Sequence, residues 1–424
     1  MLRVLMFARQ ISPAPTMSPP LKFDSTFEFT VKVQKTIGIR CLFEPYPTSL
    51  RDKLSMNAGF ITTFMMLSYC VLGQVTNVIL LLNGHRETQE AVEELATQIV
   101  CTTFCITGLV KMYGLAYHRN TLANIIEEFR TMWDEQLLTL ADRQLCDKVF
   151  RPTMSITAFA AIGNIVMVSA FNFLPVAEML FNKWQTDAWK RFQPYVIWFP
   201  FDSTTGWWYY LVYTFEAYSG YIVAVSNVGT NCIFCLLCAH LTMQLQLLNR
   251  SLEIMMEPKE KEEVFGRNDA KRNLCKLVQW HQKLLRAKET MDSVFSVTFF
   301  LNFSASTVLI CVQAFLMLIA DFYVVTKMAL FMGCCLVEIF FLCYYGDEVL
   351  EFSTRLAQAV YNCRWYQIQA DDARFGRNLI PIIQRAQRPM KLMAWKFWPI
   401  TINSFALILN ASWSYFTLLR TFVK

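Results

Sequence analysis

Cysteine and histidine are the residues of this chain that could bind a metal or carry out redox chemistry. Cys232, Cys235 and Cys238 recur three residues apart, and Cys101 and Cys105 are four apart. CxxC spacing is typical of zinc sites and of thiol–disulfide catalysis. Only four histidines accompany the 14 cysteines, and these cysteines lie inside long apolar runs. The pattern therefore favours small, polarisable packing residues on buried helices.

Motifs for other kinds of catalysis are missing from the sequence. It contains no phosphate-binding P-loop, no HExxH, no GxSxG and no dinucleotide-binding glycine fingerprint. We therefore expect no enzyme: no catalytic residue, no metal site and no cofactor.

Polar, uncharged side chains follow one face of the last apolar segment. Such a stripe either forms hydrogen bonds to a neighbouring helix, the more frequent case, or lines water. Leu418 and Phe422 lie beside it and could form an apolar constriction that excludes water. The segment has no acidic residue, so strong selectivity for divalent ions is not indicated. The stripe falls within about 80° of a helix face and comprises Asn403, Asn410, Ser414, Thr417 and Thr421.

The composition excludes a soluble protein. Hydrophobic residues make up 54% of the 424 residues and charged residues only 17%, whereas about 25% charged residues is usual. With 14 Gly and 14 Pro, the chain is also too poor in turn residues for a β architecture. These proportions predict an all-α membrane protein.

Seven apolar segments are long enough to cross a bilayer, for which about 20 residues are needed. Lys111 closes the second segment, and its long side chain is expected to reach the membrane interface. Lys327 and Glu338 interrupt the sixth segment, which is otherwise too apolar for a loop. The segments span 54–84, 95–110, 152–177, 217–249, 293–320, 322–345 and 397–419.

Basic residues orient these segments. Of the 39 Lys and Arg residues, 31 lie in the N-terminal arm and in the second, fourth and sixth connections, against 7 on the opposite side. Because positive charge is retained in the cytoplasm, the N-terminus is predicted to be cytoplasmic and the C-terminus extracellular. The predicted organisation is a cytoplasmic arm over 1–53, spans one to six within 54–346, cytoplasmic helices over 250–292 and 347–396, and the seventh span within 397–424.

Both cytoplasmic helices have one apolar face at helical spacing. Two interpretations remain open: the faces pack together within one subunit, or they form an interface between subunits below the membrane. The faces comprise Leu274, Leu277, Val278, His281, Leu284 and Leu285 in the first helix, and Val349, Phe352, Leu356, Val360 and Cys363 in the second.

The C-terminal third resembles the insect odorant receptors. Two weaker matches lie upstream, Phe215-Glu216-Ala217-Tyr218 and Trp280-His281-Gln282. Trp395 departs from the family's pattern, in which a small residue, often Gly, is usual. The dense matches are Tyr345-Gly346-Asp347-Glu348, Ala359-Val360-Tyr361, Trp365-Tyr366, Arg385-Ala386-Gln387-Arg388-Pro389-Met390-Lys391, Lys396-Phe397 and Ser414-Tyr415-Phe416-Thr417-Leu418-Leu419.

This resemblance implies an odorant-gated, nonselective cation channel built as a tetramer, with the seventh helix of each subunit lining one central pore. Monovalent cations would permeate, with calcium as a further candidate. By the same analogy the cytoplasmic helices anchor the subunits together. The connection between the fourth and fifth spans is short, unlike that of the family's co-receptor, so the chain resembles an odorant-tuning subunit that forms a heterotetramer with it. The implied pore and gate residues are Asn410, Ser414, Thr417, Leu418, Thr421 and Phe422.

The resemblance also implies an odorant pocket among the outer halves of spans two to six. The residues expected there are mostly aromatic, which suits small, neutral, volatile ligands. They are Gln98, Thr102, Ser169, Phe173, Tyr210, Tyr213, Phe315 and Phe331.

The implied location is the plasma membrane of olfactory sensory neurons, with membrane lipid around the spans and no nucleic-acid partner. A G-protein-coupled chemoreceptor is the alternative, but it requires an extracellular N-terminus. A secondary transporter should show internal repeats or broken helices, and the sequence shows neither.

Overall fold

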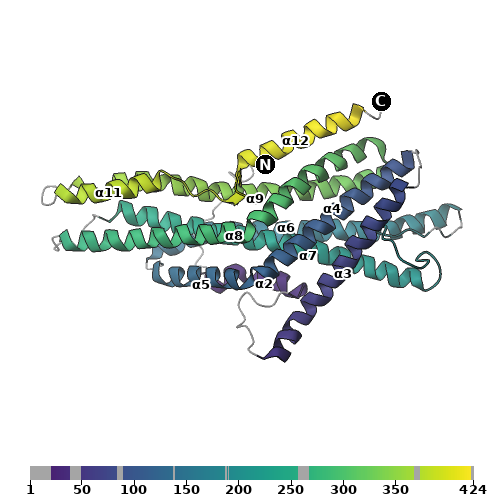
Figure 1. Ribbon diagram of the computed structural model, residues 1–424, viewed down its shortest axis with the longest axis horizontal. Coiled ribbons are helices and arrows are strands. Elements are labelled where there is room, and N and C mark those ends of the chain that lie inside the picture. The colour runs from purple at the N-terminus through teal and green to yellow at the C-terminus, as the bar shows by residue number, and fades with distance from the viewer. Residues whose placement is uncertain are drawn as a thin grey trace.

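The computed structural model describes residues 21–38, 49–83, 89–136, 139–186, 189, 191–255, 267–366 and 373–421. Long helices run roughly side by side, with one short two-stranded ribbon (Figure 1). The elements are α2 (Phe23–Thr36), α3 (Leu50–Asn83), α4 (Gln89–Tyr117), α5 (Arg119–Gln136), α6 (Leu140–Thr186), α7 (Trp208–Glu253), α8 (Arg267–Ile319), α9 (Phe322–Asn362), α11 (Ala373–Ala386), β1 (Met393–Ala394), β2 (Trp398–Pro399) and α12 (Ile402–Thr421).

Six of the described helices, α3, α4 and α6 to α9, are long and apolar enough to cross a membrane. The seventh predicted segment forms α12, a helix of 20 residues. It is not among these six helices, and it carries the predicted polar stripe. Helices α6 to α9 have 47, 46, 53 and 41 residues, about twice what a bilayer requires. The predicted all-α membrane fold, with helices that extend beyond the membrane, is confirmed.

Helix α7 is the centre of the bundle. In its most apolar stretch 94% of the residues are buried, against 22% for α3 at the periphery. It packs against α9, α6 and α4. Cys232, Cys235 and Cys238 on α7 are buried among apolar side chains, which confirms their interpretation as packing residues.

An ion pair inside the membrane region joins α4 to α9. The Nζ atom of Lys111 donates a hydrogen bond to Oε1 of Glu338 over 2.7 Å, and Asn231 Nδ2 on α7 donates to the same oxygen. Lys111 is only 1% exposed. The expectation that Lys111 reaches the membrane interface is therefore wrong, because a carboxylate within the bundle provides a better partner than the interface.

Below the membrane the helices share one core. Helix α2, from the N-terminal arm, packs its Phe23 and Phe27 rings against the imidazole of His240 on α7, and Thr26 hydrogen-bonds that imidazole over 3.1 Å. The apolar faces predicted for the two cytoplasmic helices enter the same core, with Leu284 and Val349 fully buried there. For these faces the structure supports packing within one subunit.

The chain turns sharply between the cytoplasmic helices and α12. Strand β1 pairs antiparallel with β2, and between them Trp395 has a φ angle of 56°. Its amide donates a hydrogen bond to the Ser296 carbonyl over 3.0 Å, and its ring packs on Phe300. The turn thus places tryptophan in the left-handed region that favours glycine.

We predict that replacing Trp395 separates the backbone cost from the ring contact. Both Trp395→Ala and Trp395→Gly lose the ring, but only alanine still carries the left-handed penalty of about 1–2 kcal/mol. The glycine variant should therefore unfold at a higher temperature than the alanine variant in a thermal melt of the purified protein. Equal melting temperatures would show that the turn is unstrained.

A candidate ligand cavity beneath an outer loop

An aromatic cavity lies between the helices near the end that the basic residues orient outward. The ring of Phe331 on α9 meets Phe104 on α4 edge-on at 4.8 Å and Phe171 on α6 edge-on at 5.8 Å, measured between ring centroids. The Tyr195 ring stacks on Phe171 at 6.1 Å. These four rings and their apolar neighbours form a surface suited to a neutral, apolar molecule.

The cavity is roofed by the loop between α6 and α7, which contributes Tyr195 and Ile197 to the lining. Two glycines make room for these side chains. A Cβ atom at Gly220 would lie 2.5 Å from the Tyr195 hydroxyl, and one at Gly73 would lie 2.5 Å from Cγ2 of Ile197. Any larger residue would push the loop outward.

Hydrogen bonds hold this loop in place. The Trp198 amide donates to the Gly73 carbonyl over 3.2 Å, and Gln98 Nε2 donates to the Val196 carbonyl over 3.0 Å. Further along, the Asp202 carboxylate accepts hydrogen bonds from the Thr204 hydroxyl and amide and the Thr205 hydroxyl, which lower its pKa. The loop is thus an ordered lid.

The cavity is small. Its volume is about 30 Å³, room for a water molecule but far below the roughly 300–1,000 Å³ of small-molecule sites. A ligand therefore enters only if the lid or the lining side chains move. Gln74 Oε1, in the lining, is buried without a hydrogen-bond partner among the described residues, so the cavity offers an acceptor to a ligand hydroxyl.

The structure brings together only part of the predicted pocket. Phe331 lines the cavity, Gln98 holds the lid, and the Thr102 hydroxyl is buried nearby on α4. Ser169, next to the lining residue Val168, hydrogen-bonds the Tyr221 hydroxyl over 2.9 Å.

The other four predicted residues, on α6, α7 and α8, lie elsewhere. The Tyr213 hydroxyl donates to the Asn172 carbonyl, outside the lining. The side chains of Phe173 and Tyr210 are 66% and 59% exposed on the surface of the bundle. Phe315 packs against Phe416 of α12.

Sequence reasoning missed the lid and the first span. Gln74 and Cys70 on α3, with Tyr195 and Ile197 in the loop, all line the cavity. A signal was present: the stretch 192–201 contains five aromatic residues in a segment that should face water. A loop with so many aromatic side chains is expected to bury some of them against the protein.

Helix α12 lies along α8 and α9 at the edge of the bundle (Figure 1). Its buried face comprises Ser404, Ile408, Ser412 and Phe416, and the Ser412 hydroxyl donates to the Thr307 carbonyl of α8 over 3.2 Å. The predicted polar stripe is on the opposite side: Asn403, Asn410, Ser414, Thr417 and Thr421 are all exposed, as is Leu418. Phe422 lies outside the described residues.

We predict that Gly73→Ala loosens the lid. The new methyl group would meet the Trp198 carbonyl at 3.1 Å as well as Ile197, and such overpacking costs about 1–3 kcal/mol. Hydrogen exchange of the amides at 195–198 should accelerate by roughly 10- to 100-fold. Gly333→Ala is the matched control, because a Cβ there meets nothing within 4 Å; unchanged exchange in Gly73→Ala would contradict the role of the lid.

Comparisons with known proteins agree with this architecture. The family model "7tm Odorant receptor" matches residues 91–413. Odorant receptors 85b and 85c of Drosophila melanogaster are 26% and 25% identical, over 77% and 93% of this chain and 82% and 98% of their own. The insect olfactory receptor OR5 from Machilis hrabei in complex with eugenol has the same fold, with a TM-score of 0.73 and 18% identity over 94% of this chain and 99% of its own. The chain therefore belongs to the insect odorant receptor family, as its C-terminal motifs predict.

Proposed function

We propose that this chain is the odorant-tuning subunit of an odorant-gated, nonselective cation channel. It would assemble with the family's co-receptor as a heterotetramer in the plasma membrane of olfactory sensory neurons, where ligand binding would depolarise the cell. Family membership supports the receptor role. The observation that carries the channel proposal is the position of α8 between the aromatic cavity and α12.

Helix α8 contacts both regions through different residues. Leu309 and Leu316 belong to the apolar cluster that contains Phe171 and Phe331 of the cavity. Cys311 and Phe315 pack instead with Phe416 and Leu419 of α12. A ligand that displaces the cavity wall can therefore shift the helix that holds α12, provided that it binds the open state more tightly than the closed state.

The ligand would be small, neutral and volatile. Four aromatic rings and other apolar side chains line the cavity, and its polar groups are few, with Gln74 supplying an acceptor that has no partner among the described residues. Ligand contact remains our proposal for the eight predicted residues: Gln98, Thr102, Ser169, Phe173, Tyr210, Tyr213, Phe315 and Phe331. The proposal is best supported for Phe331, which lines the cavity, and Gln98 would act through the lid.

The pore would be lined by the exposed polar face of α12. Within the described chain, Asn410 and Ser414 donate no hydrogen bond to a neighbouring helix, and the Thr417 and Thr421 hydroxyls bond to carbonyls of α12 itself. Such a face suits water and partly hydrated cations. Exposed Leu418, with Phe422, would form the apolar gate. Monovalent cations, and calcium as a further candidate, would permeate.

The tuning role is supported by the connection between α7 and α8. Helix α7 ends at Glu253 and α8 begins at Arg267, which leaves little room for the large insertion typical of the co-receptor. The alternative, a G-protein-coupled chemoreceptor, requires the opposite orientation, which the distribution of basic residues disfavours.

The proposal is tested by recording currents from cells that express this chain with a co-receptor. Application of a broad panel of volatiles should evoke a cation current that persists when G proteins are blocked. No current with any volatile, from protein detected at the cell surface, would contradict the channel proposal. Loss of the current on G-protein block would favour the alternative.

A matched pair of variants then separates ligand binding in the cavity from its transmission through α8 to α12. Phe331→Ala should raise the half-maximal odorant concentration by about tenfold or more, because a large apolar contact is lost. Phe315→Ala removes the same side chain from the α8–α12 contact, so it should change the basal or maximal current with a smaller shift in sensitivity. Equal shifts in both variants would show that the cavity is not the binding site.

A further inference from the structure

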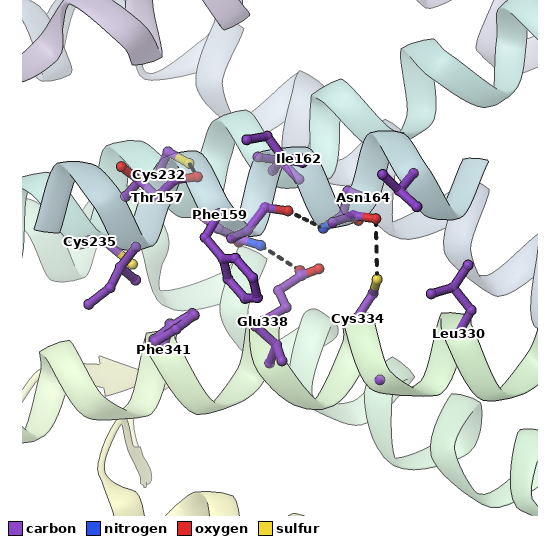
Figure 2. A pocket seen from close by; sticks show the side chains of 18 of the residues that line it. Thr157, Phe159, Ile162, Asn164, Cys232, Cys235, Leu330, Cys334, Glu338 and Phe341 are labelled. Carbon is purple, nitrogen blue, oxygen red and sulfur yellow. Dashed lines mark hydrogen bonds between the residues drawn. The ribbon is translucent and has the colours of Figure 1, made fainter. Parts of the chain in front are cut away.

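A second, larger cavity opens on the side of the bundle, between α6, α7 and α9 (Figure 2). Its volume is about 470 Å³, which falls in the range of small-molecule sites. The side chains at its rim, Phe159, Ile162 and Val166, are more than half exposed. They lie in the membrane-crossing part of α6, so the groove opens to lipid.

Small residues form part of two walls of this groove. Ala160 and Gly163 of α6 face Ala329 and Gly333 of α9 across it. A Cβ at Gly333 would meet nothing within 4 Å, and one at Gly163 would meet only the Cys334 sulfur, at 3.9 Å. Close helix packing therefore does not require either glycine, unlike the usual reason for small residues in membrane helices.

The floor of the groove carries acceptors that lack donors. Glu338 reaches from α9 toward α6 in Figure 2, and its Oε1 accepts hydrogen bonds from Lys111 and Asn231. Its second oxygen, Oε2, accepts no hydrogen bond from the described residues. Asn231 Oδ1 is buried without a partner there as well. In an apolar environment an acceptor without a donor is costly, so the site is suited to a ligand with a hydroxyl group.

We propose that this groove binds a sterol of the surrounding bilayer. Its hydroxyl would donate to Glu338 Oε2, and its rigid, flat ring system would lie against the glycine and alanine residues of the groove walls. A phospholipid head group fits less well: the groove lining contains no lysine or arginine, and the carboxylate of Glu338 would repel a phosphate.

The depth of the floor agrees with this ligand. Glu338 is 16 residues into α9, about 24 Å along the helix axis, which places it toward the cytoplasmic side of a core roughly 30 Å thick. The rim residue Leu330 is eight residues earlier, about 12 Å closer to the outer face. A sterol of the cytoplasmic leaflet would thus direct its hydroxyl inward and its rings toward the midplane.

Photolabelling of the full-length protein in membranes tests the proposal. The probe is a cholesterol analogue that carries a photoreactive diazirine on the ring system and an alkyne on the tail. Labelled peptides should come from α6 and α9 around the groove. Gly333→Leu should fill the groove and reduce labelling by about tenfold, whereas Ala58→Leu, on the exposed face of α3, should leave it unchanged. Thermal melting and surface expression of both variants confirm that each is folded.

Competition with unlabelled molecules identifies which ligand occupies the groove. Unlabelled cholesterol should suppress labelling, and its 3-keto analogue, which has no hydroxyl donor, should do so several-fold less well. Equal labelling of Gly333→Leu and wild type, or peptides from elsewhere, would overturn the site. Competition by 1-decanol but not by cholesterol would show that a free alcohol occupies the groove and would refute the sterol. Because labelling requires no current, this result is independent of the channel proposal.

Discussion

The ion pair between Lys111 and Glu338 is the constraint on which the arrangement of the bundle depends. In hydrocarbon an isolated charge is expensive, and removing one partner of a buried pair typically costs about 3–5 kcal/mol. The pair therefore links α4 to α9. Asn231 on the central helix α7 donates to the same carboxylate. Side chains from three helices therefore meet at Glu338.

These three helices contribute to the cavity and to the core at the opposite end of the bundle. Toward the outside, α4, α7 and α9 contribute Phe104, Gly220 and Phe331 to the cavity and to the seat of its lid. Toward the inside, α7 and α9 continue into the core that includes α2 and α8. Helix α8 packs on the cavity wall and on α12 and also contacts α4, α7 and α9, so it connects α12 to these three helices.

The sequence predicted where the spans lie, but it did not predict which face of each span is buried. Charge-free runs locate apolar helices because hydrocarbon excludes charge, and the motifs from Tyr345 onward identified the family. Which face of an apolar helix meets lipid, core or ligand is not encoded by hydropathy, so Phe173 and Phe331 look alike in sequence but one is exposed and the other lines the cavity. The lid was missed because a loop has no periodicity, and the partner of Lys111 because it lies 227 residues away.

A double-mutant cycle on the ion pair tests this account most directly. Thermal unfolding of the purified full-length protein in lipid nanodiscs would be compared for Lys111→Met, Glu338→Gln and the double variant. Each single variant leaves a buried polar or charged group without its partner, whereas the double variant removes both charges. We expect the double variant to lose less unfolding free energy than the two single variants lose together, by about 2 kcal/mol or more. Strictly additive losses would contradict the claim that the arrangement of the bundle depends on this pair.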